Sequence, residues 1–428
     1  GNLISVDNDG DHPGEHERFV HILEGSDSGW RINWQFGKYQ LENESYKVWM
    51  DEKLHVPHFD GQAAYLLPPL ALAPDGPAGL VYQPGTALNK QWENYFFGSY
   101  FKGSAAKSQI QAFRLKPKGA SFEVAETRDV VSGIVSTGLA VGPDGAIYIN
   151  DWLETYDKKP IGRIWKLDVS DKNQQQRMET QKLLANGMAS RTNQELKSLL
   201  AHEDMRVRLE AQFDLVKRQS HTDLLEVLSS SEHEMATIHA VWGLGQLARK
   251  DPTVNHDLLP YLVHNNAEIQ AQVAKVLGDA RCKQASEMLL ELLKHPSARV
   301  KLYAAEALGK IKEKKAFHSL VDLINVTGES DPHLRHALVY ALSKLEMESE
   351  LEQLAENESL AVRLGAVVAL RRMLSPALST FLNDPDSLVL IETARAIHDD
   401  QSVPQALPFL ACLLYTSPSP RDLNPNLV

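Results

Sequence analysis

The feature that most constrains the fold is an apolar helical segment that recurs through the second half of the sequence. It occurs first as RLEAQFDL and returns as TIHAVWGL, QAQVAKVL, KLYAAEAL, RHALVYAL, RLGAVVAL and LIETARAI, at residues 208–215, 237–244, 270–277, 301–308, 335–342, 363–370 and 390–397. The last residues of successive segments are separated by 29, 33, 31, 34, 28 and 27 positions. Small and large apolar residues alternate at helical spacing, as packing between neighbouring helix pairs requires. The repeat therefore predicts an α-solenoid in which each segment is the second helix of a pair.

The start of the solenoid is marked by a capping box. Thr192 and Glu195 have the spacing at which each side chain bonds the other residue's backbone N–H, and apolar Leu196 follows. The repeats resemble HEAT repeats, with about seven units over residues 192–411. Because a solenoid offers an extended face along its length, we expect it to bind a protein partner or to space domains.

The first half is predicted to be β-structure, and its clearest element is Leu139–Trp152, LAVGPDGAIYINDW. An apolar strand enters a Gly-Pro-Asp-Gly turn, and a second strand follows. Pro143 presets φ for a turn, and Gly145 supplies the positive φ that a tight reversal needs. With β-branched and aromatic residues on both sides, the stretch predicts a β-hairpin. A third strand is expected at residues 162–167, and the three strands are typical of one β-propeller blade.

Similar strands and turns are expected upstream of this hairpin. They cover residues 1–6, 19–23, 79–82, 95–99 and 110–115, and their alternation is typical of half-buried antiparallel strands. An aromatic-rich patch lies between Trp30 and Trp49. Core packing between blades is the expected use of these rings, with stacking against a sugar as the alternative.

An acidic loop, DNDGDHPGEHE, covers Asp7–Glu17. Oxygen ligands at alternate positions suit a hard cation such as calcium, and the alternative is a solvated loop between blades. The loop is not an EF-hand, because His12 stands at the sixth position, where glycine is required, and Arg18 at the twelfth, where glutamate is required. The histidine pair His55–His58 is expected to be structural, since a proline breaks any helix between the two.

Composition excludes several classes of protein. The chain has 428 residues and a net charge of −12, which argues against a nucleic-acid-binding surface. No apolar run approaches the ~20 residues that a transmembrane helix needs. Cys282 and Cys412 are the two cysteines, and neither belongs to a CxxC or CxxCH motif. A disulfide scaffold, a zinc ribbon and c-type haem attachment are therefore excluded within these residues.

Three stretches taken together resemble a known family. Asp7–Trp30, the run QWENYFFGSYFK at Gln91–Lys102 and the turn Gly142–Gly145 look like the glucose/sorbosone dehydrogenase family, six-bladed β-propellers related to soluble quinoprotein glucose dehydrogenases. The likeness is closer to large bacterial proteins of the membrane-bound dehydrogenase or haem-binding kind, which join such a propeller to HEAT repeats and a c-type cytochrome domain. The resemblance implies a multidomain β + α chain. It places about three blades, the C-terminal half of a propeller, at residues 1–169, a linker at 170–191 and the HEAT solenoid after it.

The resemblance also assigns site residues. It implies that the backbone carbonyls of Gly10 and Asp11 bind a calcium ion that holds pyrroloquinoline quinone, and that Lys102 contacts this cofactor. Two arginines of the quinoproteins fall here on Val135 and Thr137, neither of which can bind a carboxylate. The family's catalytic histidine belongs to an earlier blade, so no catalytic residue is assigned within this chain.

Two functions are carried forward. The first is a fragment of a periplasmic or secreted oxidoreductase, of the sugar or alcohol dehydrogenase type, that passes electrons to a c-type haem domain absent from this chain. The second is a non-enzymatic scaffold whose propeller binds a glycan or protein and whose solenoid binds a partner. This fragment alone is expected to be inactive, because half a propeller exposes strand edges and lacks half its pocket.

The segments that flank the solenoid complete the interpretation. Ser170–Gln181 is polar and glutamine-rich, which indicates the exit from the propeller. From Cys412 to residue 428 the sequence resembles translated sequencing-adapter sequence found in metagenomic assemblies. We expect a non-native tail there that packs against nothing.

Overall fold

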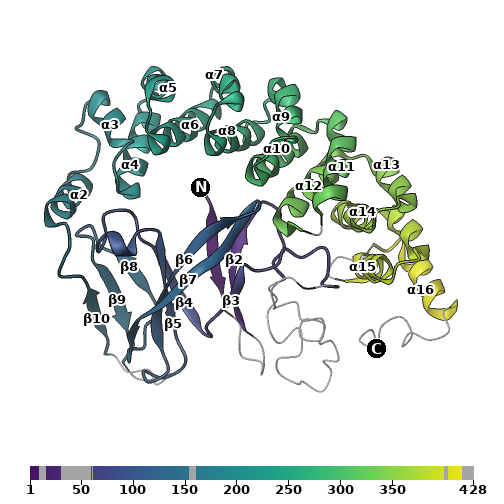
Figure 1. Cartoon of the computed structure of the whole chain (residues 1–428), viewed down its shortest axis with the longest axis horizontal. Coiled ribbons are helices and arrows are strands. Elements are labelled where there is room, and N and C mark those ends of the chain that lie inside the picture. Colours follow the sequence, from purple (N-terminus) through teal and green to yellow (C-terminus); the bar gives the residue numbers. More distant parts are fainter. Residues whose placement is uncertain are drawn as a thin grey trace. The chain divides into compact units, whose positions relative to one another are not determined.

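The computed structural model describes residues 1–8, 16–29, 59, 61–153, 161–328, 330–399 and 403–416. The chain divides into two compact units. The first unit comprises Gly1–His21, Leu70–Lys118 and Phe122–His264, and the second comprises Ile22–Pro69, Gly119–Ser121 and Asn265–Val428. Strands occupy the first part of the sequence and helices the rest (Figure 1). The predicted domain boundaries, after residues 169, 191 and 411, stay predictions.

The described strands form three small, open sheets. Their orders are β1-β2-β3, β4-β5-β6-β7 and β10-β9-β8. The strands are β1 (Leu3–Asp7), β2 (Glu17–Ile22), β3 (Ala71–Ala73), β4 (Pro77–Tyr82), β5 (Tyr95–Tyr100), β6 (Gln109–Lys118), β7 (Ser121–Ser132), β8 (Leu139–Val141), β9 (Ile147–Asp151) and β10 (Arg163–Leu167). The paired strands with a defined register are antiparallel. The sequence predicted a partial β-propeller followed by an α-solenoid. Within the described ranges the first part consists of small, open antiparallel sheets that do not close into a propeller.

The predicted hairpin is confirmed. β8 and β9 pair with Leu139 opposite Ile149, and β10 adds to β9 as the third strand. In the turn, the Gly145 N–H donates to the Gly142 carbonyl at 2.9 Å, and Gly145 has a φ of 75°. A side chain at Gly145 would be strained, as the sequence pattern predicted.

The sheets of the first unit bury apolar residues between them. Successive β5 residues Phe96 and Phe97 point to opposite faces, as strand geometry requires. Phe97 belongs to a cluster shared with β6 and β9, and Phe96 packs on a second cluster shared with β2, β3 and β6. The Phe96 ring stacks on Phe113, its cross-strand partner, with ring centroids 5.1 Å apart. The middle sheet therefore has an apolar layer on each face.

The first unit continues into helices. They are α2 (Gln174–Asn186), α3 (Asn193–Leu199), α4 (Met205–Lys217), α5 (His221–Ser230), α6 (Glu234–Ala248), η3 (Pro252–Val254), α7 (Asn255–Leu258) and η4 (Leu259–Val263). The predicted capping box is confirmed at α3, where the Thr192 and Glu195 side chains each bond the other residue's backbone N–H.

The second unit contains the later helices. They are α8 (Ala267–Asp279), η5 (Lys283–Ala285), α9 (Ser286–Leu292), α10 (Ala298–Ile311), η6 (Lys314–Ala316), α11 (Phe317–Thr327), α12 (Pro332–Leu345), α13 (Glu348–Gln353), η7 (Leu354–Glu356), α14 (Leu360–Met373), η8 (Pro376–Asn383), α15 (Ser387–His398) and α16 (Leu407–Thr416). Helices α8, α10, α12 and α14 pack in sequence order. The approach is close: a Cβ on Gly278 would lie 2.6 Å from the Ala307 Cα.

All seven repeated segments are helical, which confirms the sequence prediction. They lie in α4, α6, α8, α10, α12, α14 and α15, and each begins three residues after the start of its helix. That common offset comes from the polar turn before each helix. In six of these seven helices the residue before the helix caps it with its own side chain, as Asp331 does by accepting from the Leu334 N–H at 3.0 Å.

Two segments differ from expectation. The polar stretch after residue 170 forms helix α2 because Asn173 caps it and Arg177 binds the Asp168 carboxylate at 2.6 Å. The expected tail is helical as far as Thr416, since α16 continues past Cys412. Among its described side chains, Cys412 is exposed, Leu413 is half-buried and Tyr415 is 91% exposed.

Candidate functional site

Lys102 lies two residues after the end of β5, and its ammonium group is close to a carboxylate. Its Nζ is 3.8 Å from Asp75 Oδ2, while Asp75 Oδ1 is 3.9 Å from His16 Nδ1. The Lys102 backbone N–H donates to Ser108 Oγ at 3.0 Å, which fixes the start of the loop after the strand. The side chain is 29% exposed. Lys102 is therefore accessible, but its charge is partly balanced by Asp75.

The other two predicted site residues, Gly10 and Asp11, lie outside the described residues. Of the acidic loop, the structure describes the ends. Asp7 closes β1 and accepts a hydrogen bond of 2.6 Å from the buried Arg18 side chain. Burial raises the pKa of Asp7, although Arg18 opposes the shift. Asp7 is thus committed to an ion pair between β1 and β2, and the calcium site at Gly10 and Asp11 stays a prediction.

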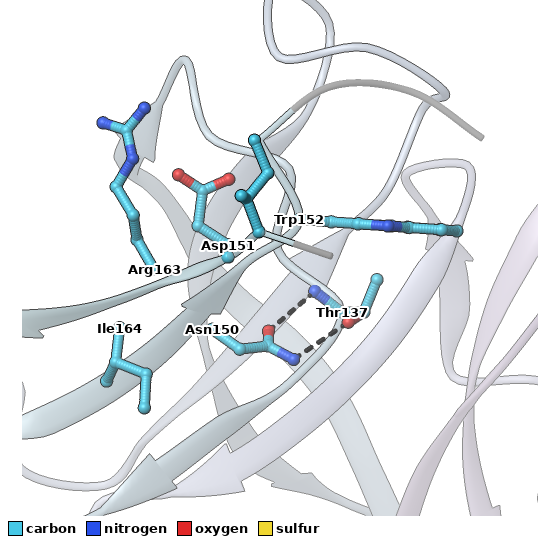
Figure 2. Close-up of a pocket in the computed structure, with 8 residues that line it drawn as sticks. Thr137, Asn150, Asp151, Trp152, Arg163 and Ile164 are labelled. Carbon is cyan, nitrogen blue, oxygen red and sulfur yellow. Dashed lines mark hydrogen bonds between the residues drawn. The ribbon is translucent and has the colours of Figure 1, made fainter. Parts of the chain in front are cut away.

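An open pocket of about 500 Å³ lies at one edge of the sheet formed by β8, β9 and β10. Figure 2 shows the side chains that surround it, which come from the segment before β8, the end of β9 and the start of β10. Its lining residues are Thr137, Asn150, Asp151, Trp152, Ile161, Gly162, Arg163 and Ile164. Antiparallel register brings them together, since Arg163 is opposite Asp151. We call this the strand-end pocket.

Two polar side chains hold the strand-end pocket in shape. The Asn150 amide accepts from the Thr137 N–H at 3.0 Å and donates to Thr137 Oγ1 at 2.9 Å (Figure 2). Asp151 is buried and accepts from the Val135 and Leu153 N–H groups, at 3.0 and 2.9 Å. These bonds pin the chain before β8 to the end of β9.

Asp151 has a structural role and does not act as a general base. Its second oxygen accepts from Trp165 Nε1 at 2.9 Å, so both carboxylate oxygens are occupied. Burial alone would raise the pKa of Asp151, but the bonds from Trp165, Leu153 and Val135 hold it below its ordinary value. A carboxylate in this state is a weak proton acceptor at neutral pH.

The strand-end pocket is also lined by an aromatic ring and a guanidinium, and its amide–hydroxyl pair has further hydrogen-bonding capacity. The Trp152 ring is half-buried, and Arg163 is exposed at the start of β10. After both Asn150–Thr137 bonds are made, the Asn150 amide still has a second N–H to donate. The Thr137 hydroxyl likewise still has its own proton to donate. The Trp152 ring also lies 5.9 Å from Phe101, the residue before Lys102. The strand-end pocket and Lys102 are therefore linked through two aromatic rings.

Two described positions differ from the arginines that the resemblance assigns to quinone binding, and the cofactor itself stays a prediction. Val135, one of the two positions where the resembled family has an arginine, is fully buried and uses its N–H to bind Asp151. Thr137, the other position, is held by Asn150. Lys102 already faces Asp75, which would repel an anionic cofactor. Arg163 is the one guanidinium among the described lining residues of the pocket.

Part of this site lies in the predicted hairpin Leu139–Trp152. The last three residues of that stretch, Asn150, Asp151 and Trp152, line the pocket. Their signal is three polar or aromatic residues directly after an apolar strand. Asp75 gave no local signal, because only the pairing of β4 with β5, in which Pro77 is opposite Tyr100, brings it beside Lys102.

Within the described ranges, no group of three or more histidine, cysteine, aspartate or glutamate side chains has a metal-binding arrangement. In the same ranges, every helix is too short or too polar to cross a bilayer.

Comparisons with known proteins concern the helical part. Residues 254–343 and 286–371 match the family model of HEAT repeats. Similar solved structures include the CpcE–CpcF complex of phycocyanin lyase from Nostoc sp. PCC7120, which is 17% identical, covers 54% of this chain and 97% of that one, and has a TM-score of 0.32. An engineered protein is 22% identical over 48% of this chain and 97% of its own, with a TM-score of 0.30.

A further similar structure is an archaeal HEAT-like repeats protein from Thermococcus onnurineus NA1. It is 13% identical, covers 55% of this chain and 94% of that one, and has a TM-score of 0.26. The search of curated proteins found no match. The match to the family model agrees with the paired helices described above. The helical half of this chain contains HEAT repeats.

Proposed function

We propose that the β-sheet region binds a carbohydrate at the strand-end pocket, as a binding module beside a HEAT scaffold. The observation that carries the proposal is the combination in one pocket of the Trp152 ring, the Arg163 guanidinium and the Asn150–Thr137 pair. An aromatic face packs against the C–H face of a sugar ring, while amide and hydroxyl groups bond its hydroxyls.

Arg163 narrows the ligand class. A guanidinium binds a carboxylate through two parallel hydrogen bonds, so an acidic sugar gains an interaction that a neutral sugar does not. The opposing charge in the pocket belongs to Asp151, which is already occupied by Trp165 and two backbone N–H groups. We therefore propose uronic acids and uronate-containing glycans as the preferred ligands.

The test is a calorimetric titration of the full chain with glucuronate and, separately, with glucose. We expect tighter binding of glucuronate, a loss of that preference in Arg163→Gln, and weaker binding of both sugars in Trp152→Ala. Arg114→Gln is the matched control, because Arg114 is a partly exposed β6 arginine that does not line the pocket. Equal binding of both sugars by the unmodified chain, or no binding of either, would contradict the proposal.

The second candidate is oxidation of a sugar or alcohol by a periplasmic or secreted dehydrogenase of the resembled type. Electrons would pass to a c-type haem partner that the solenoid positions. What favours it is Lys102, whose ammonium group lies two residues past the end of β5 and is 29% exposed. Its test is spectroscopic titration with calcium and pyrroloquinoline quinone. Quinone binding that Lys102→Ala abolishes would support this function, and absence of binding would count against it.

A further inference from the structure

The chain between β2 and β3 contributes two described segments, residues 22–29 and 61–69, to the second unit. Both segments contact the second helices of consecutive HEAT repeats. Residues 22–29 contact α10, α12 and α14, and residues 61–69 contact α14 and α15. In solenoids of this kind such helices line the face that binds partners. In this molecule that face of the second unit already carries polypeptide.

Glu24 makes the strongest contact. Its carboxylate is 2.5 Å from Lys310 Nζ on α10 and accepts from the Tyr340 hydroxyl on α12 at 2.9 Å. The Lys310 side chain is only 10% exposed, and Asp279 of α8 holds it from the other side at 2.5 Å. Burial opposes ionisation of Glu24, but Lys310 and Tyr340 lower its pKa below the ordinary value. The site is therefore built for a carboxylate.

The helices also bind the backbone around Glu24. His336 Nε2 is 2.9 Å from the Glu24 carbonyl, and its Nδ1 is 3.3 Å from Arg372 Nη2. Because a carbonyl only accepts and a guanidinium only donates, His336 is neutral with its proton on Nε2. Burial and then Arg372 lower the pKa of His336 to about 4, which agrees with that state. Arg372 Nη1 donates to the next carbonyl, that of Gly25, at 2.9 Å.

Glycine is strongly favoured after the glutamate. Gly25 has a φ of 67°, and a Cβ placed on it would lie 3.0 Å from Tyr340 Cδ2. A larger residue would be strained by its backbone and would press on the ring that binds Glu24. The recognised element is thus a Glu-Gly turn. The helices bind the Glu24 carboxylate and the Glu24 and Gly25 carbonyls, and Tyr340 leaves little room for a side chain at Gly25.

The second segment is bound in a similar way one and two repeats further along. The Glu392 carboxylate of α15 accepts from the Ala64 and Tyr65 N–H groups, at 2.9 and 3.1 Å. The Arg371 guanidinium of α14 lies 3.9 Å above the Tyr65 ring. Charged side chains of the helices thus bind backbone groups of both segments, Arg372 in the first and Glu392 in the second.

We propose that the face formed by α10, α12, α14 and α15 is a peptide-binding groove specific for an acidic segment with a Glu-Gly turn. Its resident ligand is the chain's own segment at residues 23–29 and 64–65. A partner peptide of the same chemistry binds there by displacing this segment. The inference is independent of carbohydrate binding, since the strand-end pocket belongs to the first unit.

The first test measures docking within the full chain by hydrogen exchange. We expect amides of residues 23–29 to exchange at least tenfold faster in Lys310→Met and in Tyr340→Phe, the second of which removes a single hydroxyl. Lys294→Met is the matched control, because Lys294 pairs with Glu291 on the exposed surface of the same unit. Unchanged exchange in both groove variants, with the fold retained by circular dichroism, would overturn the proposal.

The second test measures binding in trans. The probe is the fluorescein-labelled peptide HILEGSDSG, which is residues 21–29. The full chain carrying Glu24→Gln and Gly25→Ala should release its own segment and bind the probe at least tenfold more tightly than the unmodified chain. Adding Lys310→Met, or replacing the probe's glutamate by glutamine, should abolish that gain. Equal affinity of all forms for both probes would contradict a specific groove.

Discussion

Replacing Asp204 by alanine tests how the first helices are joined to the sheets of the first unit. Asp204 is fully buried and caps α4 by accepting from the Arg206 N–H at 3.0 Å. Its carboxylate also accepts from Thr86 Oγ1 at 2.6 Å and from Arg206 Nη2 at 2.8 Å. Arg206 Nη1 in turn donates to the Gly142 carbonyl at 2.9 Å. Asp204 and Arg206 together therefore connect α4 to two loops of the sheet region.

The contacts give the size of the effect. Loss of an N-cap costs about 1 kcal/mol. The Thr86 hydroxyl, left without its acceptor in a buried site, adds about 1 kcal/mol. Arg206 loses its ion-pair partner but keeps its bond to the Gly142 carbonyl and is partly exposed. The loss of this ion pair therefore costs less than that of a fully buried one, about 1–2 kcal/mol. The Asp204→Ala total is about 3–4 kcal/mol, and Asp204→Asn, which keeps a good cap, should cost roughly half as much.

Native-state hydrogen exchange of the α4 amides measures this cost as a local opening free energy. The matched control is Asp386→Ala, because Asp386 caps α15 by accepting from the Leu388 N–H at 2.9 Å without a comparable network. We expect the control to lower the opening free energy of α15 by only about 1 kcal/mol. The reasoning is refuted if Asp204→Ala costs α4 no more than Asp386→Ala costs α15.

Two further predictions concern pH. Burial alone would raise the pKa of Asp168, but Arg177 and its other partners lower it to about 2, so its stabilisation is present above pH 3.8 and is lost as pH falls through about 2. Arg177→Gln should therefore move acid unfolding, followed by circular dichroism, to higher pH, and an unchanged midpoint would contradict this. Burial raises the pKa of Glu306 to about 7, and the charged groups around it are Lys310, Glu24, Lys275 and Asp279. The stability that protonated Glu306 contributes is fully present below pH 4.5 and is lost as pH rises through 7. Glu306→Gln should raise the melting temperature at pH 8 but not at pH 5, and an equal change at both would count against the assignment.

The helical half of the fold could be predicted from local sequence patterns. The repeated segments were recognisable because a helix that packs on its neighbours shows its apolar spacing in eight residues, and the capping box shows where the first such helix begins. The hairpin at Gly142–Gly145 was equally local, since a Pro and a positive-φ Gly define the turn. No propeller closure is present in the described sheets, and the predicted roles of Lys102, Gly10 and Asp11 stay predictions.

Contacts between distant residues could not be predicted. Helix α2 forms from a polar stretch because Arg177 reaches the Asp144 carbonyl 33 residues away, at 2.6 Å. The 12-residue strand β7 was not anticipated, since its polar residues face solvent and only pairing with β6 orders it. Glu24, 286 residues before Lys310 in the chain, looked like an ordinary turn residue beside Gly25. In each case the determining partner lies outside any sequence window.

Carbohydrate binding at the strand-end pocket is tested most directly by fluorine NMR of the full chain labelled with 5-fluorotryptophan. The Trp152 resonance is assigned as the one that disappears in Trp152→Phe. On addition of glucuronate this resonance should shift in a saturable way while the other tryptophan resonances stay in place, and the shift should be lost in Arg163→Gln. A Trp152 resonance that does not move with glucuronate or with any glycan of a uronate-containing panel would contradict the proposal.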